Sequence, residues 1–138
     1  MIYIKKEDYN SIIDYGREGL PNEVCGLLAG KIEGRDRIIE KVYYLTNIDA
    51  SPEHFSMDPR EQLAAIRDMR KEGLIMIGNF HSHPETPSRP SEEDKRLAHD
   101  SNSRYLILSL ADTEKPVLRA FIIRNHTEVS MEEINISS

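Results

Sequence analysis

Hydrophobic residues recur at helical spacing in three segments of the chain. In the first, residues 6–20, Ile12 and Ile13 share that spacing with neighbouring tyrosines, and the segment ends near Gly19. A later and more polar segment, residues 91–100, has the sequence SEEDKRLAHD and begins with a serine that can cap a helix. Both segments are therefore predicted to be helices.

The remaining helical segment, residues 58–73, has the clearest boundaries in the sequence. Asp58 is a good N-cap, Pro59 suits the first helical position, and Gly73 suits the residue after the last turn. Its apolar residues are expected on one side of the helix: Leu63, Ile66 and Met69. We expect this side to pack against the core.

Short runs rich in Val, Ile, Tyr and Phe predict strands between the helices. The strands are expected at residues 2–4, on both sides of a turn at 33–36 within 23–47, and at 54–58, 74–83, 104–110, 117–124 and 127–134. Helices and strands in this order predict an α+β fold, with helices flanking one mixed, mainly antiparallel sheet.

The size and composition of the chain narrow its class. Its 138 residues, 38% hydrophobic and 30% charged, predict a single globular domain covering residues 1–138. The formal net charge of −6, without a block of Lys or Arg, argues against a nucleic-acid partner.

The N-terminal sequence, the length of the apolar runs and the cysteine content further limit the class of protein. The opening MIYIKKEDYN lacks the apolar stretch of a signal peptide, and no apolar run approaches the roughly 20 residues that span a bilayer. We therefore expect a cytoplasmic protein without a membrane partner. The single cysteine, Cys25, excludes an internal disulfide and a CxxC metal knuckle, and its apolar setting predicts a buried side chain.

Two histidines one residue apart are the first candidate for chemistry. Because side chains alternate along a strand, His81 and His83 are predicted to point to the same side, with Ser82 on the other. Catalytic zinc takes three ligands from His, Asp or Glu and leaves a position for water. Asp94 is the nearest further ligand, and it lies on the same side of a predicted first helical turn as Ser91.

The same residues also have a purely structural interpretation. Ser91 followed by an acidic residue at Asp94 is the arrangement of a helix capping box, which needs no metal. Both interpretations stay open on spacing alone. The other histidines, His54, His99 and His126, are expected to be ordinary surface or packing residues.

These residues, taken together, resemble the JAMM metalloprotease family, whose domain is also called the catalytic MPN or JAB domain, and in particular its compact prokaryotic members. The positions that carry the resemblance are His81-Ser82-His83-Pro84, Pro90-Ser91, Asp94 and, upstream, Glu23 in NEVCGLLAGK. The match extends to the order of helices and strands over nearly all the chain. It implies a JAB1/MPN-like fold, layered like a cytidine deaminase, and a zinc hydrolase.

The resemblance also implies a role for each residue. His81, His83 and Asp94 would bind one zinc ion per chain, Glu23 would act as general base, and Ser91 would donate a hydrogen bond to the oxyanion or the attacking water. From the residues alone, four other glutamates remain rival bases: Glu53, Glu85, Glu92 and Glu93. Partial burial beside VCGLLAG would raise the pKa of Glu23.

The family implies a peptidase or isopeptidase that cuts after the C-terminal tail of a ubiquitin-like protein. Because the chain has no room for long insertions, we expect a sulfur-carrier protein as its partner, with release of an attached amino acid such as cysteine as one form of the reaction. A non-catalytic MPN scaffold and a zinc amidohydrolase acting on a small molecule are the alternatives. Homodimerisation through a helix face is left open, since no surface stripe favours it.

Overall fold

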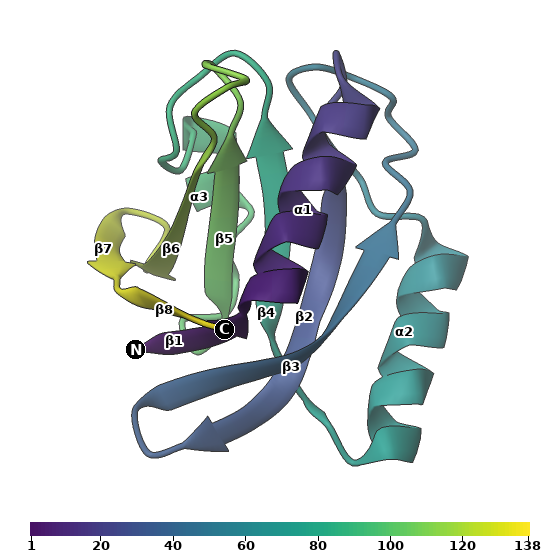
Figure 1. The fold of residues 1–138 in the computed structure, drawn as a ribbon, viewed down its shortest axis with the longest axis vertical. Coiled ribbons are helices and arrows are strands. Elements are labelled where there is room, and N and C mark those ends of the chain that lie inside the picture. Colours follow the sequence, from purple (N-terminus) through teal and green to yellow (C-terminus); the bar gives the residue numbers. More distant parts are fainter.

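The computed structural model describes residues 1–138 and contains one continuous sheet with three helices (Figure 1). The elements in chain order are β1 (Ile2–Lys5), α1 (Lys6–Gly19), β2 (Cys25–Glu33), β3 (Asp36–Leu45), α2 (Pro59–Glu72), β4 (Ile75–His83), α3 (Glu92–Arg96), β5 (Arg104–Ser109), β6 (Val117–Arg124), β7 (Glu128–Glu132) and β8 (Ile134–Ser137). The α+β prediction with a mixed sheet is confirmed.

The strand order in the sheet is β7-β6-β5-β4-β2-β3-β1-β8. Parallel pairing joins β4 to β5 and β1 to both β3 and β8, and the other pairs are antiparallel. Only Glu133 separates the two edge strands along the chain, so the sheet must curve until β7 and β8 come close together. The central position of β4 matters most for function, because this strand carries the two histidines.

Two hydrophobic clusters cover the two faces of the sheet. On one face α1 packs through Ile12 and Ile13 against Phe80 and Leu106 in a cluster of 14 buried residues. On the other face α2 packs against β2 in a smaller cluster (Figure 1). The smaller cluster comprises Cys25, Leu27, Ala29, Leu45, Ala65 and Met69. Each large side chain buried in this way contributes about 1.5–3 kcal/mol.

The boundaries of α2 agree with the sequence prediction. Of the three residues predicted to face the core, Met69 is buried, Ile66 is half-buried and Leu63 is exposed. Asp58 accepts hydrogen bonds from the first-turn backbone, and Gly73 ends the helix with φ of 71°. Ala65 and Met69 are the buried residues, whereas Leu63 is 49% exposed. The helix packs on β2 through Ala65, whose small side chain allows close approach. Leu63 consequently lies on the side of the helix that faces solvent.

Three further predictions need correction. Residues 54–58 form no strand and contribute only the isolated bridge between Asn47 and Met57. The third helix ends at Arg96 instead of continuing to residue 100, and the ring of His126 hydrogen-bonds the carbonyl of Lys95 at its end. The last predicted strand divides into β7 and β8, since the chain leaves β6 and pairs with β1 on the opposite edge.

No helix in the fold combines the length and the apolar character that crossing a bilayer requires.

Candidate metal centre

Strand β4 brings two imidazoles together, with their Nε2 atoms 3.1 Å apart. His81 lies between Cys25 of β2 and Ile107 of β5 in the sheet register. Because side chains alternate, His81 and His83 share the face covered by α2, and Ser82 points to the opposite face. Both histidines are buried, with exposed fractions of 2% and 6%. The predicted convergence of the two histidines is therefore present.

Asp94 reaches these imidazoles from the first turn of α3. The Asp94 backbone N–H donates to Ser91 Oγ at 3.0 Å, and Asp94 Oδ2 accepts from the Ser91 backbone N–H at 2.9 Å. The same Oδ2 lies 3.1 Å from His81 Nε2 and 3.2 Å from His83 Nε2. The capping box and the three-residue cluster thus coexist, and the cap itself aims the carboxylate at the histidines.

Different neighbours fix the two imidazole rings. His83 Nδ1 donates to the carbonyl of Pro87 at 3.0 Å, which leaves Nε2 as the lone-pair nitrogen in the neutral ring. The ring of His81 stacks on Phe55, with centroids 4.7 Å apart and 23° between the planes. Nδ1 of His81 is buried and has no hydrogen-bond partner within the protein. Stacking therefore sets the plane of His81, whereas a hydrogen bond sets that of His83.

Two buried hydroxyls hold the loop that carries the Pro87 carbonyl. Ser88 Oγ donates to the carbonyl of Ile107 at 2.6 Å, and Ser109 Oγ donates to the carbonyl of Thr86 at 2.7 Å. These bonds anchor the residue on each side of Pro87 to β5. The carbonyl that orients His83 consequently belongs to a rigid part of the loop.

The cluster is electrostatically prepared for a cation. Burial alone would raise the pKa of Asp94, but hydrogen bonds from His81 and His83 outweigh it and hold that pKa below its usual range. Burial likewise opposes the charging of His83, yet its bonds to Asp94 and to the Pro87 carbonyl raise its pKa. A carboxylate that stays ionised in a buried place requires nearby positive charge, which protonated imidazole or a metal ion supplies.

Glu23 lies in the segment just before β2 and is only 6% exposed. Its pKa is raised to about 7, chiefly because burial disfavours the charged form; His83 lowers it and the Asp94 carboxylate raises it further. The backbone is tied from several sides. The Glu23 N–H donates to the Ser51 carbonyl at 2.8 Å, and the next N–H, that of Val24, donates to Ser82 Oγ at 2.8 Å.

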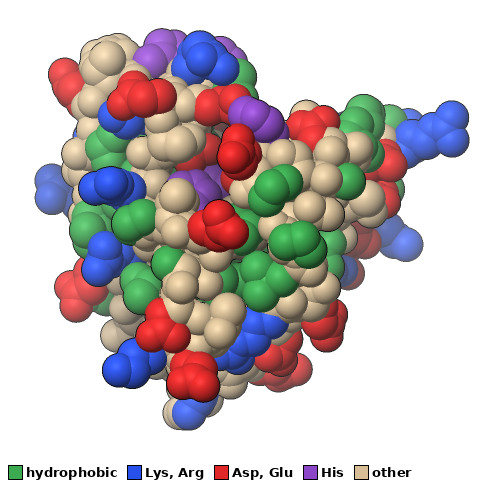
Figure 2. Space-filling model, turned by 90° about the horizontal axis from the view of Figure 1, so that it is seen from above, with side chains coloured by type: hydrophobic (Ala, Val, Ile, Leu, Met, Phe, Trp, Pro, Cys, Tyr) green, Lys and Arg blue, Asp and Glu red, His purple; other side chains and the backbone are tan.

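Glu23, His83 and Ser91 line one recess of about 320 Å³. Two of the rival glutamates, Glu53 and Glu85, also line it, but both are exposed. The end of the molecule viewed in Figure 2 shows histidine and acidic side chains gathered on the same surface. Among the three glutamates that line the recess, only Glu23 is buried.

The other rivals and histidines have separate partners. Glu92 pairs with Lys95, and Glu93 pairs with the ring of His54 at 3.0 Å. His99 and His126 pack edge to face on the surface, with ring centroids 5.4 Å apart. None of the three other histidines belongs to the His81, His83 and Asp94 cluster.

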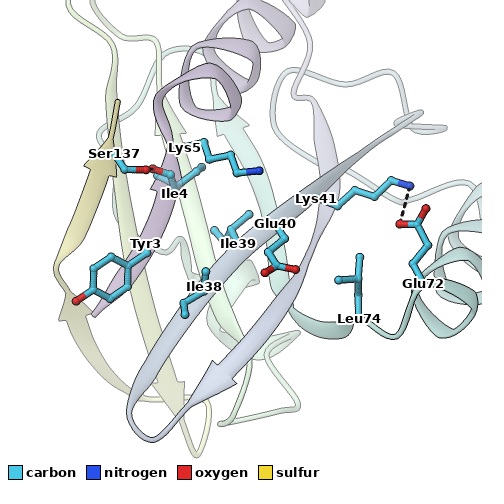
Figure 3. Close-up of a pocket in the computed structure, with 10 residues that line it drawn as sticks. All are labelled: Tyr3, Ile4, Lys5, Ile38, Ile39, Glu40, Lys41, Glu72, Leu74 and Ser137. Carbon is cyan, nitrogen blue, oxygen red and sulfur yellow. Dashed lines mark hydrogen bonds and ion pairs between the residues drawn. The ribbon is translucent and has the colours of Figure 1, made fainter.

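A larger hollow of about 420 Å³ lies away from this cluster, between β1, β3 and the end of α2 (Figure 3). Its lining residues are Tyr3, Ile4, Lys5, Ile38, Ile39, Glu40, Lys41, Glu72, Leu74 and Ser137. The Lys41 ammonium is already paired with Asp68 at 2.6 Å and Glu72 at 3.2 Å. The hollow contains none of the three residues whose donor atoms converge, and it has no comparable group of metal ligands.

The three-residue cluster fits a zinc ion. Ligands about 2.0–2.1 Å from a tetrahedral zinc lie about 3.3 Å from one another. The two Nε2 atoms are 3.1 Å apart, and each lies within 3.2 Å of Asp94 Oδ2. Two imidazoles and one carboxylate are also a ligand set typical of catalytic zinc, because they leave a fourth position free.

Comparison with known proteins agrees with this geometry. A family model described as prokaryotic homologs of the JAB domain matches residues 5–128 of the chain. The chain belongs to this prokaryotic JAB-domain family. Within the family, a CysO-cysteine peptidase from Mycobacterium tuberculosis is 32% identical over 136 residues, which cover 99% of this chain and 91% of that protein.

Two further relatives of this JAB-domain protein are informative. A desampylase from Pyrococcus furiosus is 35% identical over 112 residues, covering 81% of this chain and 74% of the desampylase. The solution structure of a protein from Desulfitobacterium hafniense superimposes with a TM-score of 0.91 at 55% identity, covering 100% of this chain and 94% of the other. Family, fold and ligand geometry therefore point to the same class of protein.

Sequence reasoning assigned no role to several residues that shape this JAB-domain site. The hydroxyl of Ser82 accepts one hydrogen bond from the backbone of Val24, and that of Ser88 donates one to the carbonyl of Ile107. The Asn47 side chain donates to the carbonyl of Glu23 at 3.0 Å, although the two residues are 24 positions apart in the sequence. No local pattern marks such residues, because their partners lie on other elements. The spacing of Ser82 within HSH was the only available signal, since it placed that side chain opposite the histidines.

Proposed function

We propose that this chain is a zinc-dependent peptidase or isopeptidase that cuts after the C-terminal tail of a ubiquitin-like sulfur-carrier protein. Residues 1–138 would form one metalloprotease domain with one zinc ion. The observation that carries the proposal is the triangle of His81, His83 and Asp94 donor atoms beside a buried Glu23. The relatives named CysO-cysteine peptidase and desampylase support the choice of substrate class.

In the proposed mechanism, His81, His83 and Asp94 hold the zinc. A bound zinc ion supplies Lewis acidity, which makes water a better nucleophile at neutral pH and polarises the scissile carbonyl. Glu23 takes a proton from the attacking water and delivers it to the leaving amine. A pKa near 7 suits both tasks, since the carboxyl group exchanges protons readily at that pH.

Ser91 has a hydrogen-bond donor to spare for the oxyanion. Its oxygen accepts the Asp94 N–H as a helix cap, which uses one acceptor position. A hydroxyl also carries one proton that it can donate, and Ser91 lines the recess that Glu23 and His83 share. The hydroxyl can therefore cap the helix and stabilise the negative charge that develops on the carbonyl oxygen.

Replacing Ser91 with Ala tests this double role. We expect kcat to fall about 100-fold or more, as for loss of one oxyanion donor. Loss of the cap should also cost about 1 kcal/mol of stability and loosen the hold on Asp94, so zinc affinity should fall as well. Steady-state kinetics at saturating zinc separates the two effects. Unchanged kcat under that condition would assign Ser91 to capping alone.

The experiment that tests the proposed function uses two fusions of a ubiquitin-like sulfur carrier. One carries a single C-terminal cysteine, and the other is joined through its C-terminal glycine to a lysine of a second protein. We expect mass spectrometry to show the free carrier released from at least one fusion, with activity lost on chelation and restored by zinc. Asp94→Ala is the matched control.

The two fusions also identify the leaving group. Release of cysteine alone would indicate an amino-acid-releasing peptidase, and cleavage of the lysine fusion would indicate an isopeptidase. If the zinc-loaded protein cuts neither fusion, the carrier-peptidase proposal is wrong. Hydrolysis of small amides under the same conditions would then favour an amidohydrolase, and complete inactivity would favour a scaffold.

A further inference from the structure

One loop, residues 47–57, contacts three separate parts of the candidate site. The Ser51 carbonyl accepts the Glu23 N–H, and Phe55 stacks on the ring of His81. The ring of His54 pairs with Glu93, which lies on α3 next to Asp94. The position of this loop is therefore coupled to Glu23, to His81 and to the helix that carries Asp94.

The side chain of Asn47 holds this loop together. Its Oδ1 accepts the backbone N–H groups of Asp49 at 3.0 Å and Ser56 at 3.1 Å. Its Nδ2 donates to the carbonyls of His54 and Glu23, both at 3.0 Å. An amide has two donor and two acceptor positions, and all four are used here. Asn47 thus closes the loop and joins it to Glu23.

We propose that Asn47 is a positioning residue for Glu23. This inference rests on the proposed function, in which Glu23 transfers protons. The Glu23 carbonyl depends on Asn47, and its N–H depends on Ser51 of the loop that Asn47 closes. Proton transfer requires the carboxylate within hydrogen-bond reach of its partner, and a displacement of about 1 Å costs up to about 100-fold in rate.

Asn47→Asp removes the two donors while keeping the shape of the side chain. Its second carboxylate oxygen would face the carbonyl oxygens of Glu23 and His54, so both bonds are lost. We expect kcat to fall about 10- to 100-fold with KM changed less than about threefold, because Asn47 is not a metal ligand and does not itself line the recess. Zinc content should remain that of the wild type. Asn47→Ala serves as a second variant without the added charge.

Ser56→Ala is the matched control from the same loop. Ser56 Oγ donates to Asp49 Oδ2 at 2.8 Å, a loop hydrogen bond that does not involve Glu23. This variant keeps the Ser56 backbone N–H that bonds to Asn47. Its kcat should remain within about twofold of the wild type. A loss equal to that of Asn47→Asp would show that general loosening of the loop explains the effect and would overturn the proposal.

A double-mutant cycle with Glu23→Gln separates positioning from a structural role. If Asn47 acts through Glu23, Asn47→Asp should slow the residual turnover of the Glu23→Gln protein by less than about twofold. A structural effect on the metal ligands or on substrate binding would persist in full in that background. Full additivity of the two losses would therefore overturn the assignment.

Amide hydrogen exchange gives a measurement that does not depend on activity. We expect Asn47→Asp and Asn47→Ala to speed exchange of the Glu23 amide at least tenfold, whereas Ser56→Ala leaves it unchanged. If the wild type cuts no carrier fusion but Glu23 loses protection in this way, the proposed function fails and the positional coupling stands. Unchanged protection of Glu23 in both Asn47 variants would overturn the coupling itself.

Discussion

Replacing Glu23 with Gln should leave zinc bound while kcat falls by about 100-fold or more. Gln keeps the size of the side chain but neither accepts nor returns a proton at neutral pH, and general acid–base catalysis contributes about 10²–10⁴-fold. Glu23 is not one of the three residues whose donor atoms converge, so the metal site should survive the change. Cleavage kinetics and metal content, measured on the same preparation, check both parts.

The matched control for this substitution is Glu53→Gln. Glu53 lines the same recess but is exposed, whereas Glu23 is buried. We expect its turnover to stay within about threefold of the wild type, since screened surface charges contribute little. Near-normal turnover of Glu23→Gln would refute the assignment of the base, and a collapse in Glu53→Gln alone would transfer the role to that residue.

Replacing His83 with Ala should remove zinc and activity together. The substitution deletes one of three converging donors, and a zinc site that retains two protein ligands binds far more weakly. It also leaves Asp94 buried beside a single imidazole. Elemental analysis of protein purified without added zinc should find about one zinc per wild-type chain and less than about a tenth of that in the variant.

Two other substitutions serve as comparisons for the zinc and activity measurements on His83→Ala. Asp94→Ala should give the same double loss, because it removes the oxygen that lies within 3.2 Å of both histidines. His99→Ala should keep both metal and activity, since His99 is an exposed residue that packs against His126. A His83→Ala protein that retains zinc and turnover would eliminate the ligand assignment. Absence of zinc from the wild type, even after zinc is supplied, would favour the scaffold alternative.

The way in which neighbouring groups hold the three metal-ligating side chains explains why single substitutions should strongly reduce zinc binding and activity. His83 is oriented by Pro87, whose neighbours Thr86 and Ser88 are bonded to β5. Asp94 is oriented by the cap with Ser91. His83 and Asp94 are thus held by hydrogen bonds, and His81 by stacking on Phe55, before any metal ion binds. Such preorganisation raises metal affinity and catalytic rate.

The sequence by itself determined the local parts of the site. Strand alternation placed His81 and His83 on one face, and the capping box placed Asp94 in the first turn of α3. The boundaries of α2 followed from Asp58 and Gly73 in the same way. These features depend on backbone geometry and hydrogen bonds within a few residues, so they can be derived from the order of residues alone.

Only the tertiary structure decided which distant residues join them. Glu23 reaches the recess because β2 pairs antiparallel with β4, placing Cys25 beside His81, and spacing could not choose it over other glutamates. The Asn47 side chain hydrogen-bonds the carbonyl of Glu23, 24 positions earlier in the sequence. In α2, the packing of Ala65 against β2 leaves Leu63 facing solvent. Strand pairing and side-chain packing join segments far apart in sequence, and these long-range contacts set the burial that raises the pKa of Glu23 to about 7.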